Sequence, residues 1–173
     1  IFHNACNSNN LELIQYLVSL GKFDINAKTN DKKTPLYYAI QSGSFQIVNY
    51  LSSLPNINLK IKDDENKTYL HVAVCSRNEF ITNHLLSLNQ IPVNAKDDSG
   101  RTILHYACMQ SNINIIKNIV EQPEIDITTT DKVKKNILHI ACEAIDDINI
   151  IQYIVSLNKI NINDKSKNGN TPL

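Results

Sequence analysis

The 173-residue chain has no tryptophan, only four cysteines, four glycines and five prolines, and no long apolar run. A helix that crosses a membrane needs roughly 18 consecutive apolar residues, so the sequence predicts no membrane insertion. Four cysteines are too few for a fold built on disulfides, and a chain of this length buries enough surface without them. We therefore expect reduced thiols and a cytoplasmic location.

Charge of one sign is also lacking, because 17 basic residues balance 17 acidic ones. A chain without net charge has no long-range attraction to a polyanion. We therefore expect no nucleic-acid partner. The 42% of hydrophobic residues is instead typical of a globular chain with a buried core.

The main feature of the sequence is an internal repeat of about 34 residues. Alanines recur at this interval, at Ala5, Ala39, Ala73, Ala107 and Ala141. The surrounding blocks are similar: TPLYYA at 34–39, TYLHVA at 68–73, TILHYA at 102–107 and NILHIA at 136–141, with HNAC from His3 and TPL from Thr171 as partial blocks. Apolar residues at helical spacing follow each block, so each unit is predicted to hold two short helices.

These blocks resemble the T-P-L-H-x-A signature of ankyrin repeats. Tetratricopeptide repeats have a similar period, but their Trp, Leu-Gly and Tyr landmarks are not found here. The resemblance implies an all-α repeat solenoid of about five units, each with a helix-turn-helix and a β-hairpin or turn loop. It predicts one ankyrin repeat domain, 1–173, with units at 1–28, 29–62, 63–96, 97–130, 131–165 and 166–173, the first and last being partial.

Two details accompany this resemblance. An inserted residue is expected near Ala144 to Asp147. Because the sequence opens inside one block and closes inside another, we expect an internal fragment of a longer array.

Residues that repeat in every unit are expected to be scaffold, because each unit solves the same packing problem. Leucines would stack into a continuous core, alanines would let helices approach closely, and histidines would bond the backbone of the turn, as the resemblance implies. Asp63, Asp97 and Asp131 are expected to cap the hairpin turns. The predicted structural motif residues are Thr34, Pro35, Leu36, Ala39, Thr68, Leu70, His71, Ala73, Thr102, Leu104, His105, Ala107, Leu138, His139 and Ala141.

Histidine and cysteine recur together, as in His105 with Cys108 and His139 with Cys142. A zinc site needs four converging ligands, whereas one pair per unit is displaced along the stack. Packing is therefore favoured over metal binding, and a cysteine nucleophile lacks any indicated cleft or orienting group. We expect no catalytic residue, no metal and no cofactor.

Binding residues should be those that vary between units. The resemblance to ankyrin repeats implies that these lie at the hairpin tips and the exposed ends of the first helices. Tyrosines at exposed positions are typical interface anchors, and Tyr38 and Tyr106 share one column. The candidates are Asp31, Lys33, Tyr38, Gln41, Glu65, Lys67, Ser76, Ser99, Arg101, Tyr106, Met109, Gln110, Val133, Lys135 and Glu143.

One column among these candidates is uniformly basic. Lys33, Lys67, Arg101 and Lys135 form this basic column. It would steer an acidic partner, or it would be ordinary surface that the neighbouring Asp31, Asp64, Glu65 and Asp98 largely neutralise.

Three functions follow as hypotheses. The first is a non-enzymatic interaction module, monomeric, that binds an unknown partner protein through a concave face. The second is a structural or regulatory spacer within a larger multidomain ankyrin protein, such as a signalling protein, ubiquitin-ligase adaptor or host effector. The third is an enzyme or metalloprotein built on the His and Cys pairs, which we reject.

Overall fold

The computed structural model describes residues 2–144 and 147–173, and these residues contain ten helices. The predicted insertion near Ala144 to Asp147 falls on residues 145 and 146, outside the described part. The helices are α1 (Phe2–Cys6), α2 (Leu11–Ser19), α3 (Pro35–Gln41), α4 (Phe45–Ser52), α5 (Tyr69–Cys75), α6 (Glu79–Ser87), α7 (Ile103–Met109), α8 (Ile113–Val120), α9 (Ile137–Ala144) and α10 (Ile148–Ser156).

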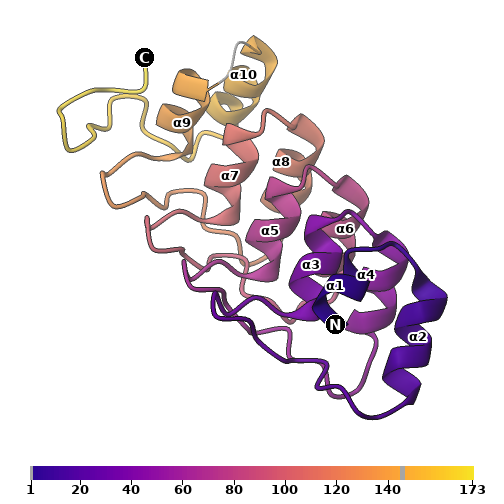
Figure 1. The fold of residues 1–173 in the computed structure, drawn as a ribbon. Helices are drawn as coiled ribbons and strands as arrows, with labels where there is room; N and C mark the ends of the chain where they lie inside the picture. Colours follow the sequence, from indigo (N-terminus) through magenta and orange to yellow (C-terminus); the bar gives the residue numbers. More distant parts are fainter. Residues whose placement is uncertain (1, 145–146) are drawn as a thin grey trace. The chain divides into compact units, whose positions relative to one another are not determined.

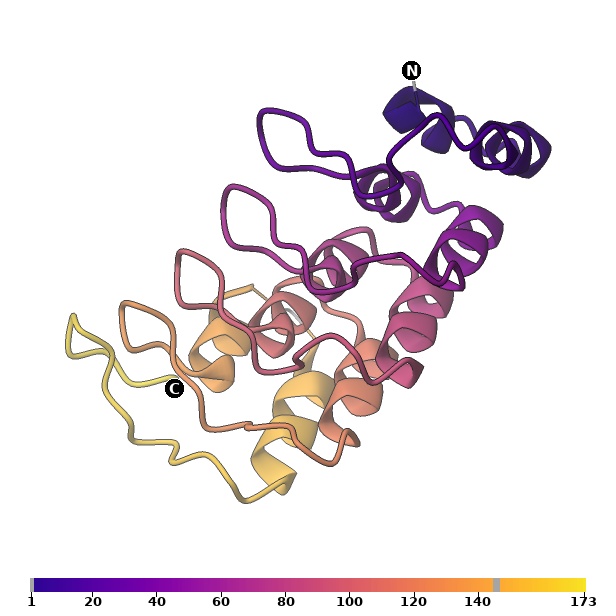
Figure 2. The ribbon, with the colours of Figure 1, turned by 90° about the horizontal axis from the view of Figure 1, so that it is seen from below.

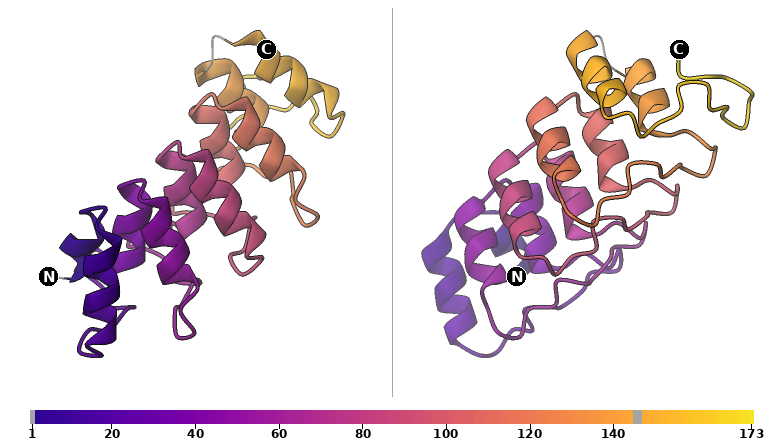
Figure 3. Two further views of the ribbon diagram at one scale, coloured as in Figure 1. Left: turned by 90° about the vertical axis from the view of Figure 1, so that its right-hand side faces the viewer. Right: turned by 180° about the vertical axis from the view of Figure 1, so that it is seen from behind.

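The chain divides into two compact units, Ile1–Pro92 and Val93–Leu173. In the first unit, α1 packs on α3 and α3 on α5, while α2 packs on α4 and α4 on α6 (Figure 1). This unit therefore has a layer of first helices and a layer of second helices. In the second unit, α7 pairs with α8, α9 pairs with α10, and α7 packs on α9 (Figure 3). Every predicted helix pair is present.

The first helices α3, α5 and α7 each begin after a capping threonine. Thr34 accepts a hydrogen bond from the Tyr37 amide at 3.2 Å, and Pro35 occupies the first turn, where its missing amide proton costs nothing. Thr68 and Thr102 form capping boxes with a histidine three residues later. The threonine column therefore sets where these helices start.

The core is formed by the apolar residues that repeat. Leu36, Leu70, Leu104 and Leu138 have no exposed surface, and neither do the four alanines of the interior blocks. Burying a leucine side chain contributes about 1.5–3 kcal/mol. The predicted burial of both columns is confirmed.

The loops between helix pairs turn back as hairpins, which project from the first helices in each unit (Figure 2). The carboxylates of Asp63, Asp97 and Asp131 are buried and accept amide protons within the turn, as Asp97 does from Ser99 at 2.9 Å and Arg101 at 2.8 Å. This confirms their predicted capping role. The described residues form no β-strand, only an isolated antiparallel bridge between Lys62 and Thr68.

Neighbouring hairpins are linked by backbone hydrogen bonds. In the second unit the Lys132 amide donates to the Ser99 carbonyl at 2.9 Å. Gly100 lies beside this bond with φ +77°, and a Cβ there would lie 2.9 Å from the Lys132 nitrogen. In other hairpins Lys32 and Lys134 adopt the same left-handed conformation without being glycine. No described helix has the length and hydropathy to span a membrane.

Candidate partner-binding site

A pocket of about 270 Å³ lies in the first unit between α3, α5 and the hairpin that precedes α5. We call it the α3/α5 pocket. Six residues line it: Tyr37, Gln41, Lys67, Val72, Cys75 and Ser76. Gln41, Lys67 and Ser76 are predicted candidates, so the fold brings three of them together from three different segments.

Tyr37 forms part of the pocket wall. It occupies the column that holds a buried histidine in three later repeats, and its larger side chain is only half-buried. Burial raises the pKa of the Tyr37 phenol, which therefore stays protonated at neutral pH. The ammonium of Lys33 lies over the Tyr37 ring, 5.3 Å from its centroid, in a cation–π contact. The pocket thus joins an aromatic wall to a cationic rim.

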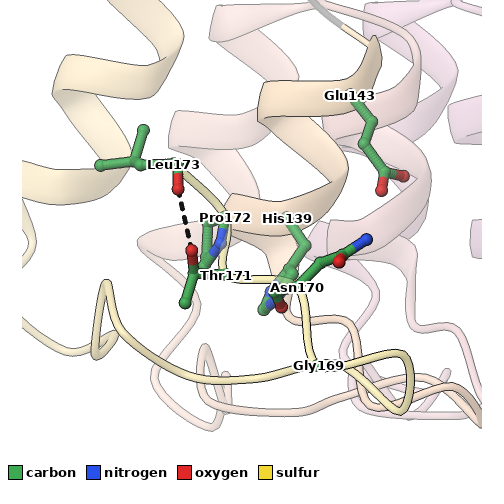
Figure 4. Close-up of a pocket in the computed structure, with 7 residues that line it drawn as sticks. All are labelled: His139, Glu143, Gly169, Asn170, Thr171, Pro172 and Leu173. Atoms are coloured by element: carbon green, nitrogen blue, oxygen red, sulfur yellow. Dashed lines mark hydrogen bonds between the residues drawn. The ribbon is translucent and has the colours of Figure 1, made fainter.

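A second pocket, of about 470 Å³, lies in the second unit between α9 and the segment 169–173 (Figure 4). His139 and Glu143 line it from α9, at the positions that Tyr37 and Gln41 hold on α3. The Nε2 of His139 is 3.1 Å from the Asn170 carbonyl, with which it shares a hydrogen bond. Both pockets therefore share two positions of a first helix in their linings, but only the α3/α5 pocket is also lined by a following helix among the described residues.

Each cation of the basic column has a carboxylate nearby. Lys33 lies 3.7 Å from Asp31, and Lys67 pairs with Glu65. Both of these carboxylates are exposed by more than half. Exposed ion pairs of this kind contribute little to the free energy of folding, and solvent readily replaces either partner.

In the second unit, the carboxylate partners of the basic column differ in burial. Arg101 Nε lies 3.8 Å from an oxygen of Asp131, whose side chain is 2% exposed. Lys135 donates to Glu143 at 2.7 Å across the rim of the second pocket. Asp31 and Glu65 are thus the predicted neighbours of the column in the first unit, whereas Asp131 and Glu143 in the second unit were not predicted as its partners.

Family models for ankyrin repeats (3 copies) match residues 1–63 and 54–131, most of the chain. This chain is an ankyrin repeat protein. A sequence search of the curated proteins gives no match. Among solved structures, the chain is similar to one chain of the complex between the predatory endopeptidase Bd0816 from Bdellovibrio bacteriovorus and the immunity protein Bd3460. The TM-score is 0.87 at 24% identity, covering 99% of this chain and 87% of that chain, which shows an all-α repeat solenoid.

The expectation that Tyr106 is exposed in this ankyrin chain is wrong. Tyr106 is 9% exposed, and its hydroxyl donates to Asp97 at 2.6 Å. The first oxygen of the Asp97 carboxylate accepts the turn amides. Because the carboxylate is buried, its second oxygen also needs a hydrogen-bond donor, and the Tyr106 hydroxyl supplies it. Val72 and Ile140 in the same column are buried too, whereas Tyr38 is partly exposed, with its ring edge-on to Tyr37.

The other ankyrin candidates remain accessible, without a shared site. Ser99, Val133 and the Glu143 carboxylate are exposed, while Met109 and Gln110 are partly exposed at the end of α7. Their role in binding stays a prediction.

Tyr37 and Cys75 line the pocket but were not among the candidates. Cys75 follows Gln41 by one repeat, so the column that contains Gln41, Met109 and Glu143 includes it. Tyr37 was visible as a departure from the motif histidine. Column position could therefore have found both residues.

The His and Cys pairs of this ankyrin chain pack rather than converge. Burial raises the pKa of the Cys6 and Cys108 thiols to about 12, so they behave as small apolar groups. The described residues contain no group of three or more His, Cys, Asp or Glu side chains placed to hold a metal ion.

Proposed function

We propose that this ankyrin chain is a non-enzymatic interaction module that binds a partner protein at the α3/α5 pocket and the hairpin tips beside it. The observation that carries the proposal is the meeting of Gln41, Lys67 and Ser76 in one hollow. The Gln41 position differs in every later repeat, as Cys75, Met109 and Glu143, and Ser76 becomes Gln110, whereas Lys67 belongs to the basic column. In a repeat fold, residues that vary at an accessible face are the ones available for recognition.

The size and chemistry of the pocket favour a protein side chain as occupant. Small-molecule sites usually enclose about 300–1,000 Å³, and the α3/α5 pocket falls below this range. Tyr37, with its raised pKa, is a hydrogen-bond donor at neutral pH rather than a base. An aromatic residue beside accessible polar groups is a typical anchor for a partner protein.

The proposal includes a cytoplasmic location and a monomeric adaptor role, which rest on the sequence arguments about thiols and repeats.

The test is an affinity capture from a lysate of the source cells, read by mass spectrometry. Gln41→Trp would fill the pocket mouth from an exposed position at the end of α3. Gln46→Trp, exposed on α4 of the same unit, is the matched control. We expect a protein retained by the natural chain and by Gln46→Trp, but lost with Gln41→Trp.

The introduced tryptophan also serves as a reporter, because the natural chain has none. Its fluorescence checks that each variant is folded and that residue 41 is accessible. A partner held equally by the natural chain and both variants would contradict binding at this pocket.

A further inference from the structure

Of the two pockets, the one in the second unit is lined by a carboxylate, and the α3/α5 pocket is not. In the second unit, Glu143 on α9 reaches Lys135 at the hairpin, with its Oε2 2.7 Å from the ammonium. In the first unit the residue at the Glu143 position is Gln41, which is neutral. The second unit thus shows how a carboxylate fits against this hairpin cation, and the first unit lacks that carboxylate.

The cations of the first unit are placed to accept such a group. Lys67 is the one lining residue of the α3/α5 pocket that is charged at neutral pH, and no described acid shares the lining. Lys33 lies over the Tyr37 ring at the same rim. The lysines therefore add positive charge to a pocket whose walls are otherwise neutral.

The carboxylates that pair with these two lysines are exposed to solvent. Asp31 is 62% and Glu65 61% exposed, so solvent screens both pairs. Arg101, at the Lys67 position of the next repeat, differs because its partner Asp131 is buried and also caps a turn. The exchangeable cations of the basic column thus include the two at the α3/α5 pocket.

From this charge complementarity we propose that the α3/α5 pocket recognises an acidic segment of its partner protein. A partner carboxylate takes the place beside Lys33 and Lys67 that Glu143 takes beside Lys135. The adjacent partner residue packs on Tyr37 and Val72. This inference rests on the proposed function and specifies the class of partner.

The test uses short synthetic peptides of one sequence whose two central residues are Glu-Glu, Gln-Gln or Lys-Lys. Binding is measured by the alkylation rate of Cys75, which lines the pocket and is exposed, with Cys142 in the second unit as reference in the same sample. We expect the Glu peptide to slow alkylation of Cys75 and to bind about fivefold more tightly than the Gln peptide. Raising the salt concentration from about 50 mM to about 300 mM should weaken binding of the Glu peptide, because salt screens the attraction between its carboxylates and the two lysines.

Two variants make the test specific. Gln41→Glu places the chain's own carboxylate where α9 has one, and should weaken the Glu peptide about fivefold. The double variant Lys33→Gln, Lys67→Gln should bind the Glu peptide no more tightly than the Gln peptide. Lys132→Gln, an exposed lysine of the second unit, should leave binding unchanged.

The outcomes separate this inference from the proposed function. Equal binding of the Glu and Gln peptides, abolished for both by Gln41→Trp, would leave the pocket as a binding site and overturn the acidic preference. Binding of the Glu peptide that survives Gln41→Trp would overturn both. No protection of Cys75 at millimolar Glu peptide, or no effect of Gln41→Glu, would overturn the acidic preference.

Discussion

His105 joins two parts of the second unit through a single imidazole ring. Its Nδ1 accepts the Thr102 amide proton at 3.2 Å, so its Nε2 carries the proton and donates to the Lys135 carbonyl at 3.2 Å. The first bond caps α7 and the second holds the next hairpin. The ring must be neutral to make both, and burial lowers the pKa of His105 below its ordinary value of 6.5.

Replacing His105 with Gln separates these two bonds. A glutamine at this helix position still reaches back to the capping amide, so the Thr102 bond is kept while the Lys135 bond is lost. One lost hydrogen bond and its uncompensated carbonyl cost about 1–3 kcal/mol. We expect His105→Gln to lower the free energy of unfolding by that amount near neutral pH.

The pH dependence gives the sharper test. Because the folded-state pKa is lowered, the unfolded chain takes up this proton first, so the stability that neutral His105 supplies is present above pH 6.5 and lost as the pH falls below it. The natural chain should lose up to about 1.4 kcal/mol per pH unit in that window, and the variant lacks this loss. The stability difference between the two chains should therefore narrow towards acid.

The measurement is urea unfolding followed by circular dichroism at several pH values between about 7.5 and about 5. Comparing the two chains at each pH cancels the other histidines, which both chains share. A difference that stays constant with pH, or that widens towards acid, would refute the assigned protonation state of the ring.

Three further predictions concern packing and the thiols. Leu104→Ala should cost about 2–5 kcal/mol in urea unfolding, since Leu104 has no exposed surface, and an unchanged midpoint would contradict the repeat register. Gly100→Ala should cost about 1–2 kcal/mol more than Gly169→Ala, because both have positive φ but only Gly100 lies against a neighbouring backbone; equal losses would mean that the hairpin shifts freely. Iodoacetamide should modify Cys75 in the folded protein and leave Cys108, buried with a pKa of about 12, unmodified until unfolding, as mass spectrometry would show.

The fold was predictable because its determinants are local and repeated. Thr34 and Thr68 cap helices through bonds to residues three positions away, and Leu36 and Leu70 are buried in the same way in successive repeats. Each helix start is specified by residues three positions apart in the sequence, and the same residue types recur in the next repeat. The ankyrin signature could therefore establish the helix pairs and the core before any coordinates.

The candidate site was only partly predictable because its residues depend on contacts between repeats. The column position of Tyr106 suggested exposure, but the demand of the buried Asp97 carboxylate for a donor turned its hydroxyl inward. Tyr38, in the same column, is partly exposed. The direction of the Tyr106 side chain thus depends on a contact with Asp97, nine positions earlier, which the column of aligned residues does not contain.

The basic column shows why a repeated residue type need not have a repeated role. Arg101 lies beside a carboxylate that is buried and also accepts two turn amides, so exchanging that partner would expose an unpaired charge inside the protein. Lys67 pairs with an exposed carboxylate, which water can solvate as soon as a partner takes its place. Under the proposal for the α3/α5 pocket, the same hairpin position serves stability in one repeat and recognition in another. The difference between Arg101 and Lys67 lies in the burial of the paired carboxylate, which is high for Asp131 and low for Glu65. A search for binding residues in this fold should therefore compare the ion-pair partners of aligned residues, and not only the aligned residues themselves.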